Sequence, residues 1–244
     1  MQPKTTPIES QQSFWNEWNA SYREKVLAEV SLEQADIVVS WLRELGRSDL
    51  TIIDVGCGTG WLCSKLTQFG HVTGTDLSDE VLARAAQRVP TVRFLAGNFM
   101  ALDFGVAIYD VAISLEVLSH VDDQLAFVQR ISRLLKPGGN LIIATQNRTA
   151  LERNAIPPPK PGQIRSWIDH LELRRLLEKD FVVERLFSIT PQFNRGPLRI
   201  VNSYKWRHLA GAIGLGEITS LVKKLQEDAW LGWTLMALGR RRFD

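Results

Sequence analysis

The feature of this sequence that most constrains its fold is a regular alternation of short apolar runs with helical stretches. The apolar runs lack the strict apolar-polar alternation of half-exposed strands, which indicates strands buried on both faces of a sheet. Intervening helices can connect such strands as crossovers, which makes the strands parallel. The expected strands are 51–55, 71–76, 92–95, 110–114, 141–145, 181–189 and 230–238. We therefore predict an α/β fold with a doubly wound, mainly parallel seven-stranded sheet and helices on both faces.

The segments outside this alternation define the expected domain organisation. Residues 1–46 are predicted to form a loose arm and a helical lid, because aromatic residues within 14–22 fall at helical spacing and Ser31-Leu32-Glu33-Gln34 has the form of a capping box. Residues 47–244 are predicted to form one domain that carries the sheet. A polar, basic stretch and a helix at about 191–228 predict a helical insertion before the last strand.

Charge and cysteine content exclude several classes of function. The chain has 29 basic and 27 acidic residues, a formal net charge of +2, so a nucleic-acid binder with a basic surface all round is not expected. Cys57 and Cys63 cannot form a disulfide framework, which suits a reducing compartment. The longest apolar run, Ala229 to Leu238, is far shorter than the ~20 residues of a membrane-spanning helix. With no signal peptide visible, we expect a soluble, cytoplasmic protein without a transmembrane segment.

The most informative motif is the glycine-rich turn Asp54-Val55-Gly56-Cys57-Gly58-Thr59-Gly60, placed between the first strand and the next helix. Such a turn lets a ligand lie against bare backbone at the carboxyl edge of a sheet. Its G-x-G-x-G spacing differs from the G-x-G-x-x-G of dinucleotide folds, whose third glycine would fall at Trp61, and no P-loop Gly-Lys-Ser or Gly-Lys-Thr follows. A tight structural turn is the plainer interpretation of these glycines.

A carboxylate at the end of the next strand strengthens the interpretation as a ligand site. Asp76 lies 20 residues after Gly56, where its side chain can accept both hydroxyls of a ribose. The alternative is a helix cap, but Ser78 is expected to fill that role. The two motifs together predict a nucleoside-bearing cofactor without a pyrophosphate.

Over roughly residues 50–147 the sequence resembles the class I S-adenosylmethionine-dependent methyltransferases. Besides the glycine-rich turn, the resemblance rests on Asp76-Leu77-Ser78, on Tyr109-Asp110-Val111 followed by Leu115-Glu116-Val117-Leu118-Ser119-His120-Val121, and on Leu134-Leu135-Lys136-Pro137-Gly138-Gly139. The chain is most similar to small-molecule enzymes such as the ubiquinone-pathway O-methyltransferases, including Thr145-Gln146-Asn147-Arg148 after the fifth strand. The resemblance implies a Rossmann-like methyltransferase domain over 47–244, with the segment at 191–228 on its acceptor side.

The same resemblance implies S-adenosylmethionine as cofactor, S-adenosylhomocysteine as product, and a set of residues that hold them. By position, Asp54 and Gly56 would lie beside the methionine moiety, Asp76 would bind the ribose and Leu77 would pack on the adenine. Family members often have an aspartate after the third strand to bind the adenine amino group, whereas this chain departs from that pattern with Asn98. The expected cofactor-binding residues are Asp54, Gly56, Gly58, Gly60, Asp76, Leu77, Asn98, Phe99 and Leu115.

Methyl transfer from a sulfonium needs chiefly an in-line arrangement of the reactants, and a base only if the acceptor carries a proton. His120, just past the fourth strand, is the candidate base, and Glu116 is the second candidate. A packing or helix-capping histidine and a buried polar anchor are the plainer interpretations of these two residues. His71, His170 and His208 have no metal-ligand spacing with one another or with the cysteines, so we predict no metal.

Two further regions are candidates for contact with the acceptor. Trp15, Trp18 and Tyr22 resemble the aromatic N-terminal helix that covers the cofactor in this family, and a helix that buries aromatic residues in the core is the alternative. Residues 147–207 carry twelve basic and six acidic residues, which favours an acceptor with a carboxylate or phosphate. Solvated surface residues are the alternative interpretation of this excess. The expected contacts, in predicted loops, are Arg148, Arg195 and Arg199.

The expected function is therefore methyl transfer to a small-molecule acceptor at oxygen or nitrogen, with an anionic metabolite among the candidate acceptors and no nucleic-acid partner. A nicotinamide dehydrogenase would need the missing glycine spacing. A nucleic-acid or protein methyltransferase would share the cofactor site, but N-methylating nucleic-acid enzymes have Asn-Pro-Pro-Tyr or a similar sequence where this chain has Ser114-Leu115-Glu116-Val117. A non-catalytic S-adenosylmethionine-binding subunit is expected to have degraded glycines, and here they are intact. The sequence identifies neither the acceptor nor the oligomeric state.

Overall fold

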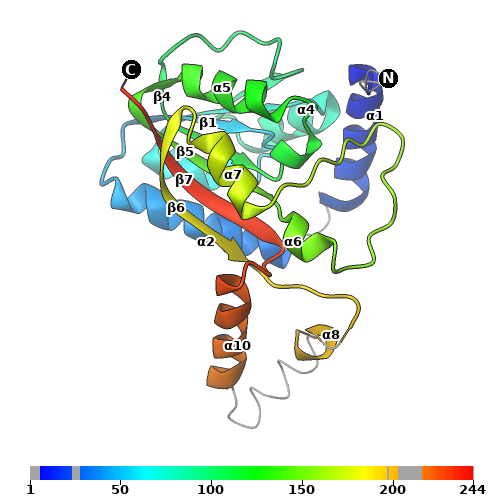
Figure 1. The fold of residues 1–244 in the computed structure, drawn as a ribbon. Coiled ribbons are helices and arrows are strands. Elements are labelled where there is room, and N and C mark those ends of the chain that lie inside the picture. The colour runs from blue at the N-terminus through cyan, green and yellow to red at the C-terminus, as the bar shows by residue number, and fades with distance from the viewer. Residues whose placement is uncertain (1–5, 24–27, 197, 203–215, 244) are drawn as a thin grey trace.

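The sheet of the computed structural model has the order that a doubly wound fold requires. The structure describes residues 6–23, 28–196, 198–202 and 216–243. Within these residues lies one seven-stranded sheet of order β3-β2-β1-β4-β5-β7-β6, in which only β7 runs antiparallel to its neighbours (Figure 1). The strands are β1 (Leu50–Val55), β2 (Gly70–Asp76), β3 (Arg93–Ala96), β4 (Tyr109–Leu115), β5 (Leu135–Gln146), β6 (Phe181–Ile189) and β7 (Thr234–Arg241). The predicted fold class is confirmed.

Helices cover both faces of this sheet. The longer ones among the described residues are α1 (Ile8–Trp18), α2 (Glu29–Glu44), α4 (Asp79–Arg88), α5 (Gln124–Leu134), α7 (His170–Leu177) and α10 (Gly216–Asp228). Short helices are α3 (Cys63–Leu66), α6 (Arg148–Leu151) and α8 (Leu198–Val201), with a π-helical turn at Asn19–Arg23 and 3₁₀ turns at Thr67–Phe69 (η2) and Leu118–His120 (η3). One hydrophobic cluster joins α2, α3 and α4 to the sheet, and a second cluster joins α5 and α7 to its other face.

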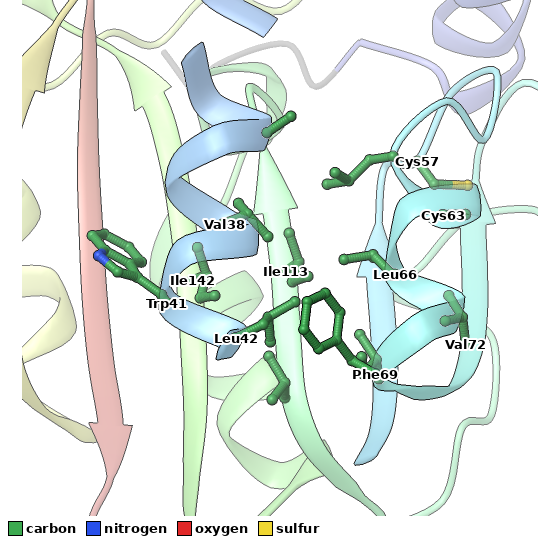
Figure 2. Packing of buried hydrophobic residues seen from close by; sticks show 14 of the residues in the cluster. Val38, Trp41, Leu42, Cys57, Cys63, Leu66, Phe69, Val72, Ile113 and Ile142 are labelled. Carbon is green, nitrogen blue, oxygen red and sulfur yellow. The ribbon is translucent and has the colours of Figure 1, made fainter. Parts of the chain in front are cut away.

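Successive residues of a strand point into opposite clusters. This explains why the strands appear in the sequence as unbroken apolar runs. Ile142 belongs to the first cluster and Ile143 to the second, and both are almost fully buried. Figure 2 shows the first cluster, where Val38 and Leu42 of α2 face Ile113 of β4. A strand buried on both faces has no position for a polar, solvent-facing residue. The resulting rigid sheet fixes the ends of its strands, where the candidate site lies.

The predicted start of the second helix was wrong. Helix α2 begins at Glu29 rather than at Ser31, and no side chain caps its first turn. Ser31 is buried, and Gln34 donates a hydrogen bond from Nε2 to Glu116 Oε1 (2.6 Å) instead of closing a capping box. Val38, Trp41 and Leu42 of α2 belong to the first core cluster, so α2 packs on the sheet. No residue of α1 belongs to that cluster.

Two boundaries near the carboxyl-terminal half also differ from expectation. Pro137-Gly138-Gly139 was expected to lie outside the fifth strand, but β5 begins at Leu135 and contains them. The pairing with β4 shifts register between Tyr109 and Val111, and this bulge accommodates a proline without an N–H and Gly138 at φ +74°. The last strand begins at Thr234 rather than at 230, because Trp230 has a positive φ of 59° in the preceding turn.

The segment before the last strand contains helical structure, as predicted. Helices α8 and α10 lie in it, and α10 projects from the body of the molecule (Figure 1). Lys223 of α10 forms an ion pair with Glu33 of α2 at 2.6 Å, and Thr190 Oγ1 donates to the other oxygen of the same carboxylate. These contacts hold the base of α10 against the domain. Residues 203–215 lie outside the described part of the chain.

Candidate functional site

A cavity of about 900 Å³ opens at the carboxyl ends of the parallel strands. One part of its wall is the glycine-rich turn after β1, with Asp76 at the end of β2 and Leu115 at the end of β4. The other part is formed by α1, η3 and the segment at 156–167. The topology therefore brings residues from both ends of the chain to the place where doubly wound folds bind ligands.

The glycine-rich turn needs glycines because of its backbone shape and its neighbours. Gly56, Gly58 and Gly60 have φ values of +78°, +52° and +68°. A Cβ on Gly56 would lie 2.1 Å from Cγ2 of Val117, which is closer than any real contact. The backbone N–H of Gly56 donates to the carbonyl of Thr75 at 2.7 Å, so the turn is bound to β2. Bare backbone is thereby exposed to the cavity at a fixed position.

The Asp76 carboxylate is held by backbone donors on both of its oxygens. Gly58 N–H donates to Oδ2 and Ser78 N–H donates to Oδ1, each at 2.8 Å. Since an ionised carboxylate accepts about four hydrogen bonds, each oxygen retains a lone pair for a ligand. Burial raises the pKa of Asp76, and backbone hydrogen bonds from Ser78, Gly58 and Leu77 oppose that shift. Ser78 occupies the N-cap position of α4 (Asp79–Arg88), as predicted, but its side chain makes no capping hydrogen bond, because its hydroxyl donates to Asn16 Oδ1 of α1 at 2.6 Å.

Asp54 is a second carboxyl group in the cavity wall and is more deeply buried. It ends β1 with 3% of its surface exposed, and Cys63 Sγ donates to its Oδ2 at 3.3 Å. Burial raises the pKa of Asp54 to about 7, with a further contribution from the nearby charge of Asp76. A carboxyl group in this state becomes fully ionised when a cation binds beside it.

The residues expected at the adenine line the same cavity, with one difference. Leu77, Asn98, Phe99 and Leu115 all line it. The Asn98 side-chain oxygen accepts the backbone N–H of Met100 at 3.0 Å, which leaves one of its two lone pairs for an adenine amino group. Asn98, which stands where an aspartate was expected from the resemblance, thus makes a hydrogen bond within its own turn.

His120 lies on η3 with its tautomer fixed by the structure. Nδ1 is 2.7 Å from the carbonyl oxygen of Ile164, which can only accept, so Nδ1 carries the proton. In the neutral ring, Nε2 is then an acceptor. Burial lowers the pKa of His120, aided by the positive charge of Arg165, so the ring is neutral at pH 7. Its edge contacts the Trp15 ring at 4.8 Å between centroids.

Glu116 has the contacts of a structural anchor. Its Oε1 accepts hydrogen bonds from Gln34 Nε2 of α2 (2.6 Å) and from Thr234 Oγ1 of β7 (2.8 Å). It also has a positive φ of 63° at the end of β4. The side chain lines the cavity but connects three elements, which favours a buried polar anchor over a catalytic base.

The N-terminal helix lies over the cavity. Phe14, Trp15 and Trp18 line it, and Phe14 is the buried residue of α1. Asn16 donates from Nδ2 to Asp79 Oδ1 at 3.0 Å, which holds α1 at the start of α4. The side chain of Tyr22 lies outside the described part of the structure.

The arginines expected to contact the acceptor lie elsewhere. Arg148 forms ion pairs with Asp169 (2.5 Å) and Glu172 (2.9 Å) at the start of α7. Arg195 donates to the carbonyl oxygens of residues 152 and 153, and Arg199 is exposed on α8 rather than in a loop. None of the three is among the residues that line the cavity.

Sequence reasoning missed several lining residues from the last residue of β5 onward. They are Gln146, Lys160, Arg165, Trp167, Gln192 and Trp233. The proline-rich run at 157–162 marked a stiff segment nearby, but no periodic pattern gives the direction of its side chains. Among the described residues, no group of three or more His, Cys, Asp or Glu is placed to hold a metal, and no helix is long and apolar enough to cross a membrane.

Comparison with known proteins agrees with this geometry. Residues 53–143 match a family model described as a methyltransferase domain. A probable S-adenosylmethionine-dependent methyltransferase of Mycolicibacterium smegmatis is 30% identical over 128 residues, 52% of this chain and 49% of the relative. The ubiquinone biosynthesis O-methyltransferase of Caulobacter vibrioides is 36% identical over 106 residues, 41% of this chain and 42% of the relative. The chain thus spans about half or less of the length of these relatives.

Solved structures extend the likeness of fold to nearly the whole chain. The N-methyltransferase NodS of Bradyrhizobium japonicum, in complex with S-adenosylhomocysteine, has a TM-score of 0.64 and 14% identity, and the match covers 95% of this chain and 98% of that one. The fold is a doubly wound α/β domain with a cavity at the carboxyl ends of its parallel strands. Residues 53–143 are thus similar to a methyltransferase domain, and over about half of its length or less the chain is similar to S-adenosylmethionine-dependent methyltransferases and ubiquinone biosynthesis O-methyltransferases.

Proposed function

We propose that this protein transfers a methyl group from S-adenosylmethionine to a small-molecule acceptor at oxygen or nitrogen. The observation that carries the proposal is the single cavity that joins the Asp76 and glycine-turn wall to an aromatic wall. The similar proteins include an O-methyltransferase and an N-methyltransferase, which supports both kinds of acceptor atom.

The residues present fit this cofactor. The unused lone pairs of Asp76 would accept the two ribose hydroxyls, and Asp54, whose ionisation a neighbouring cation favours, would face the ammonium group of the methionine moiety. The backbone of Gly56 and Gly58 would contact the ligand without interference from side chains, whereas Gly60 lies outside the cavity wall beside Phe94. Leu77 and Phe99 would contact the adenine. When bound, S-adenosylmethionine supplies a methyl group on a positively charged sulfur.

The chain's own contribution is positioning, exclusion of water and proton removal. Trp15 and Trp18 of α1 cover the cavity, which keeps water from the reacting groups. Holding the acceptor in line can supply up to roughly 7–11 kcal/mol of the barrier reduction in well-oriented systems. The Nε2 atom of His120 would take the proton of an acceptor hydroxyl or N–H.

A nucleic-acid or protein methyltransferase and a non-catalytic cofactor-binding subunit are the alternatives. Both would share the cofactor half of the cavity. Neither requires an acceptor half walled by tryptophans and closed over by α1, and this wall favours a small molecule.

The cofactor assignment is tested by calorimetry with S-adenosylhomocysteine and NAD. We expect micromolar binding of the first and none of the second. Asp76→Ala should weaken S-adenosylhomocysteine binding by about 1.5–3 kcal/mol, because a charged acceptor of two hydroxyls is lost. Asp103→Ala is the matched control, because Asp103 is exposed and outside the cavity wall. Saturable NAD binding without a response to S-adenosylhomocysteine would overturn the assignment, and unchanged affinity in a folded Asp76→Ala variant would remove Asp76 from the site.

A further inference from the structure

Arg165 is a cation in the cavity wall that the proposed function does not use. Its guanidinium donates from Nη1 to the Pro157 carbonyl (2.6 Å) and from Nη2 to Gln163 Oε1 (3.1 Å), and it lies over the Trp167 ring at 5.2 Å. Within the described residues, no carboxylate forms an ion pair with it. Burial alone lowers the pKa of Arg165, so its charge is desolvated without compensation by an acid.

The segment that carries Arg165 is held rigidly at three places. Ile164 accepts the hydrogen bond from His120, and Ser166 N–H donates to the Ser119 carbonyl at 2.8 Å. On the other side, Gly162 packs directly on the backbone of Ser10 in α1. Arg165 is also close enough for its charge to lower the pKa of His120. The unpaired guanidinium and the candidate base therefore share the acceptor half of the cavity.

The remaining walls of that half suit a flat ring. Trp15, Trp167 and Trp233 line the cavity from three separate elements. Trp167 Nε1 donates to Gln146 Oε1 at 2.7 Å, so the orientation of the Gln146 amide is fixed and its NH₂ group remains able to donate. Aromatic walls with a few fixed polar groups bind planar molecules by stacking and orient them by hydrogen bonds.

We propose, resting on the proposed function, that the acceptor is a planar aromatic acid whose carboxylate binds Arg165. A guanidinium has five N–H donors, and the two hydrogen bonds to the chain leave three, enough for a charge-assisted contact to both carboxylate oxygens. Lys160 adds a second positive charge to the same wall. Arg165 thus takes the role that the charge excess of residues 147–207 suggested for Arg148, Arg195 and Arg199.

The inference is tested by calorimetry on protein saturated with S-adenosylhomocysteine, with 2-naphthoate and 2-naphthamide as probes. The two probes differ in charge but hardly in shape. We expect the acid to bind about 10- to 100-fold more tightly than the amide, as hydrogen bonds to a charged group imply. Arg165→Gln should reduce this ratio to within about threefold by weakening only the acid. Arg195→Gln, which removes an exposed arginine outside the cavity, should leave the ratio unchanged.

The outcomes separate this inference from the proposed function. Failure of wild-type protein to bind S-adenosylhomocysteine would overturn the proposed function. Normal S-adenosylhomocysteine binding with equal affinity for the two probes, with neither probe bound, or with an unchanged ratio in Arg165→Gln, would overturn the aromatic acid alone. Should Arg165→Gln fail to fold, salt serves instead: raising its concentration should weaken the binding of 2-naphthoate and leave that of 2-naphthamide unchanged, and equal responses would refute the ion pair.

Discussion

The candidate base His120 lies in an environment that sets its protonation state. A histidine in water is partly protonated at neutral pH, with a pKa of about 6.5. Here burial lowers the pKa and the Ile164 carbonyl retains the proton on Nδ1. The neutral ring therefore presents Nε2 as a base over the whole physiological pH range, whereas Glu116 is occupied by its two hydrogen-bond donors.

His120→Ala is expected to lower turnover by about 10²-fold or more while S-adenosylhomocysteine affinity barely changes, because a proton acceptor is lost and the cofactor wall is untouched. In the wild type, kcat/KM should remain constant as the pH falls to about 6.5 and decline only below it, since the free base is the active form. Transfer of a labelled methyl group measures both effects. His71→Ala, at an exposed position, is the control. Equal turnover of wild type and His120→Ala would leave positioning as the whole mechanism.

Individual residues were predictable where a motif fixed their backbone position. Asp54 and Asp76 lie at the carboxyl ends of strands that the sequence locates, His120 lies shortly after another, and all three line the cavity. Arg165 was not predictable, because its position depends on the carbonyl of Pro157 and the ring of Trp167. Those contacts exist only in the folded chain.

Among the elements, the strands were predicted well and the helix starts poorly. Burial on both faces leaves a strong apolar signal, and all seven predicted strands correspond to strands of the structure. A helix start depends on a few hydrogen bonds, and in α2 those of Gln34 go to Glu116 across the domain. Likewise, the bulge in β5 accepts a Pro-Gly-Gly run that local rules place outside a strand.

The junction between α1 and the segment at 156–167 depends on Gly162. Its φ is +82°, and a Cβ there would lie 2.2 Å from the Ser10 carbonyl oxygen. A side chain at this position therefore displaces α1, together with the tryptophans that it places over the cavity. The position of α1 over the cavity therefore depends on the position of the segment that carries Arg165.

Gly162→Ala is expected to weaken binding of both S-adenosylhomocysteine and 2-naphthoate, as measured by calorimetry. Gly46→Ala is the matched control, because Gly46 has a similar φ of +64° and a Cβ there would meet no atom within 4 Å. Both variants should lose roughly 1–2 kcal/mol of stability from the left-handed backbone, measured by denaturant unfolding. Equal binding by the two variants would contradict the role assigned to this junction.

At the scale of the whole molecule, two parts of the chain form the cavity, and the sequence predicts one of them better than the other. The cofactor wall comes from β1 to β4, within the stretch of 53–143 that matches the family model. The acceptor wall comes from α1 and from residues after β5, which lie outside that stretch. Sequence motifs therefore predicted the cofactor, while the acceptor wall emerges from contacts between distant segments such as Gly162 and Ser10.

The buried carboxyl of Asp54 makes the stability of the whole domain depend on pH. Its pKa rises from an ordinary 3.8 to about 7 on folding, so the folded state favours the protonated form. The stabilisation is complete below the unfolded pKa and is lost as the pH rises through about 7. Asp110 has the opposite sign, because hydrogen bonds from Thr51, Lys136 and Arg47 outweigh its burial and lower its pKa.

A bound ammonium group would favour the ionised form of Asp54, which burial disfavours in the ligand-free protein. We therefore expect the affinity for S-adenosylhomocysteine to increase from about pH 6 to about pH 8, with proton release on binding. In the ligand-free protein, the Asp54 contribution to the free energy of unfolding should fall over about pH 4–7. Asp54→Asn should remove both effects, while Asp110→Asn should lower stability at neutral pH and remove only the loss of stability that occurs as the pH falls below about 4. Calorimetry in buffers of different ionisation enthalpy measures the affinity and the proton release, and denaturant unfolding measures the stability. A wild-type affinity that does not change between about pH 6 and about pH 8 would place the ammonium group away from Asp54.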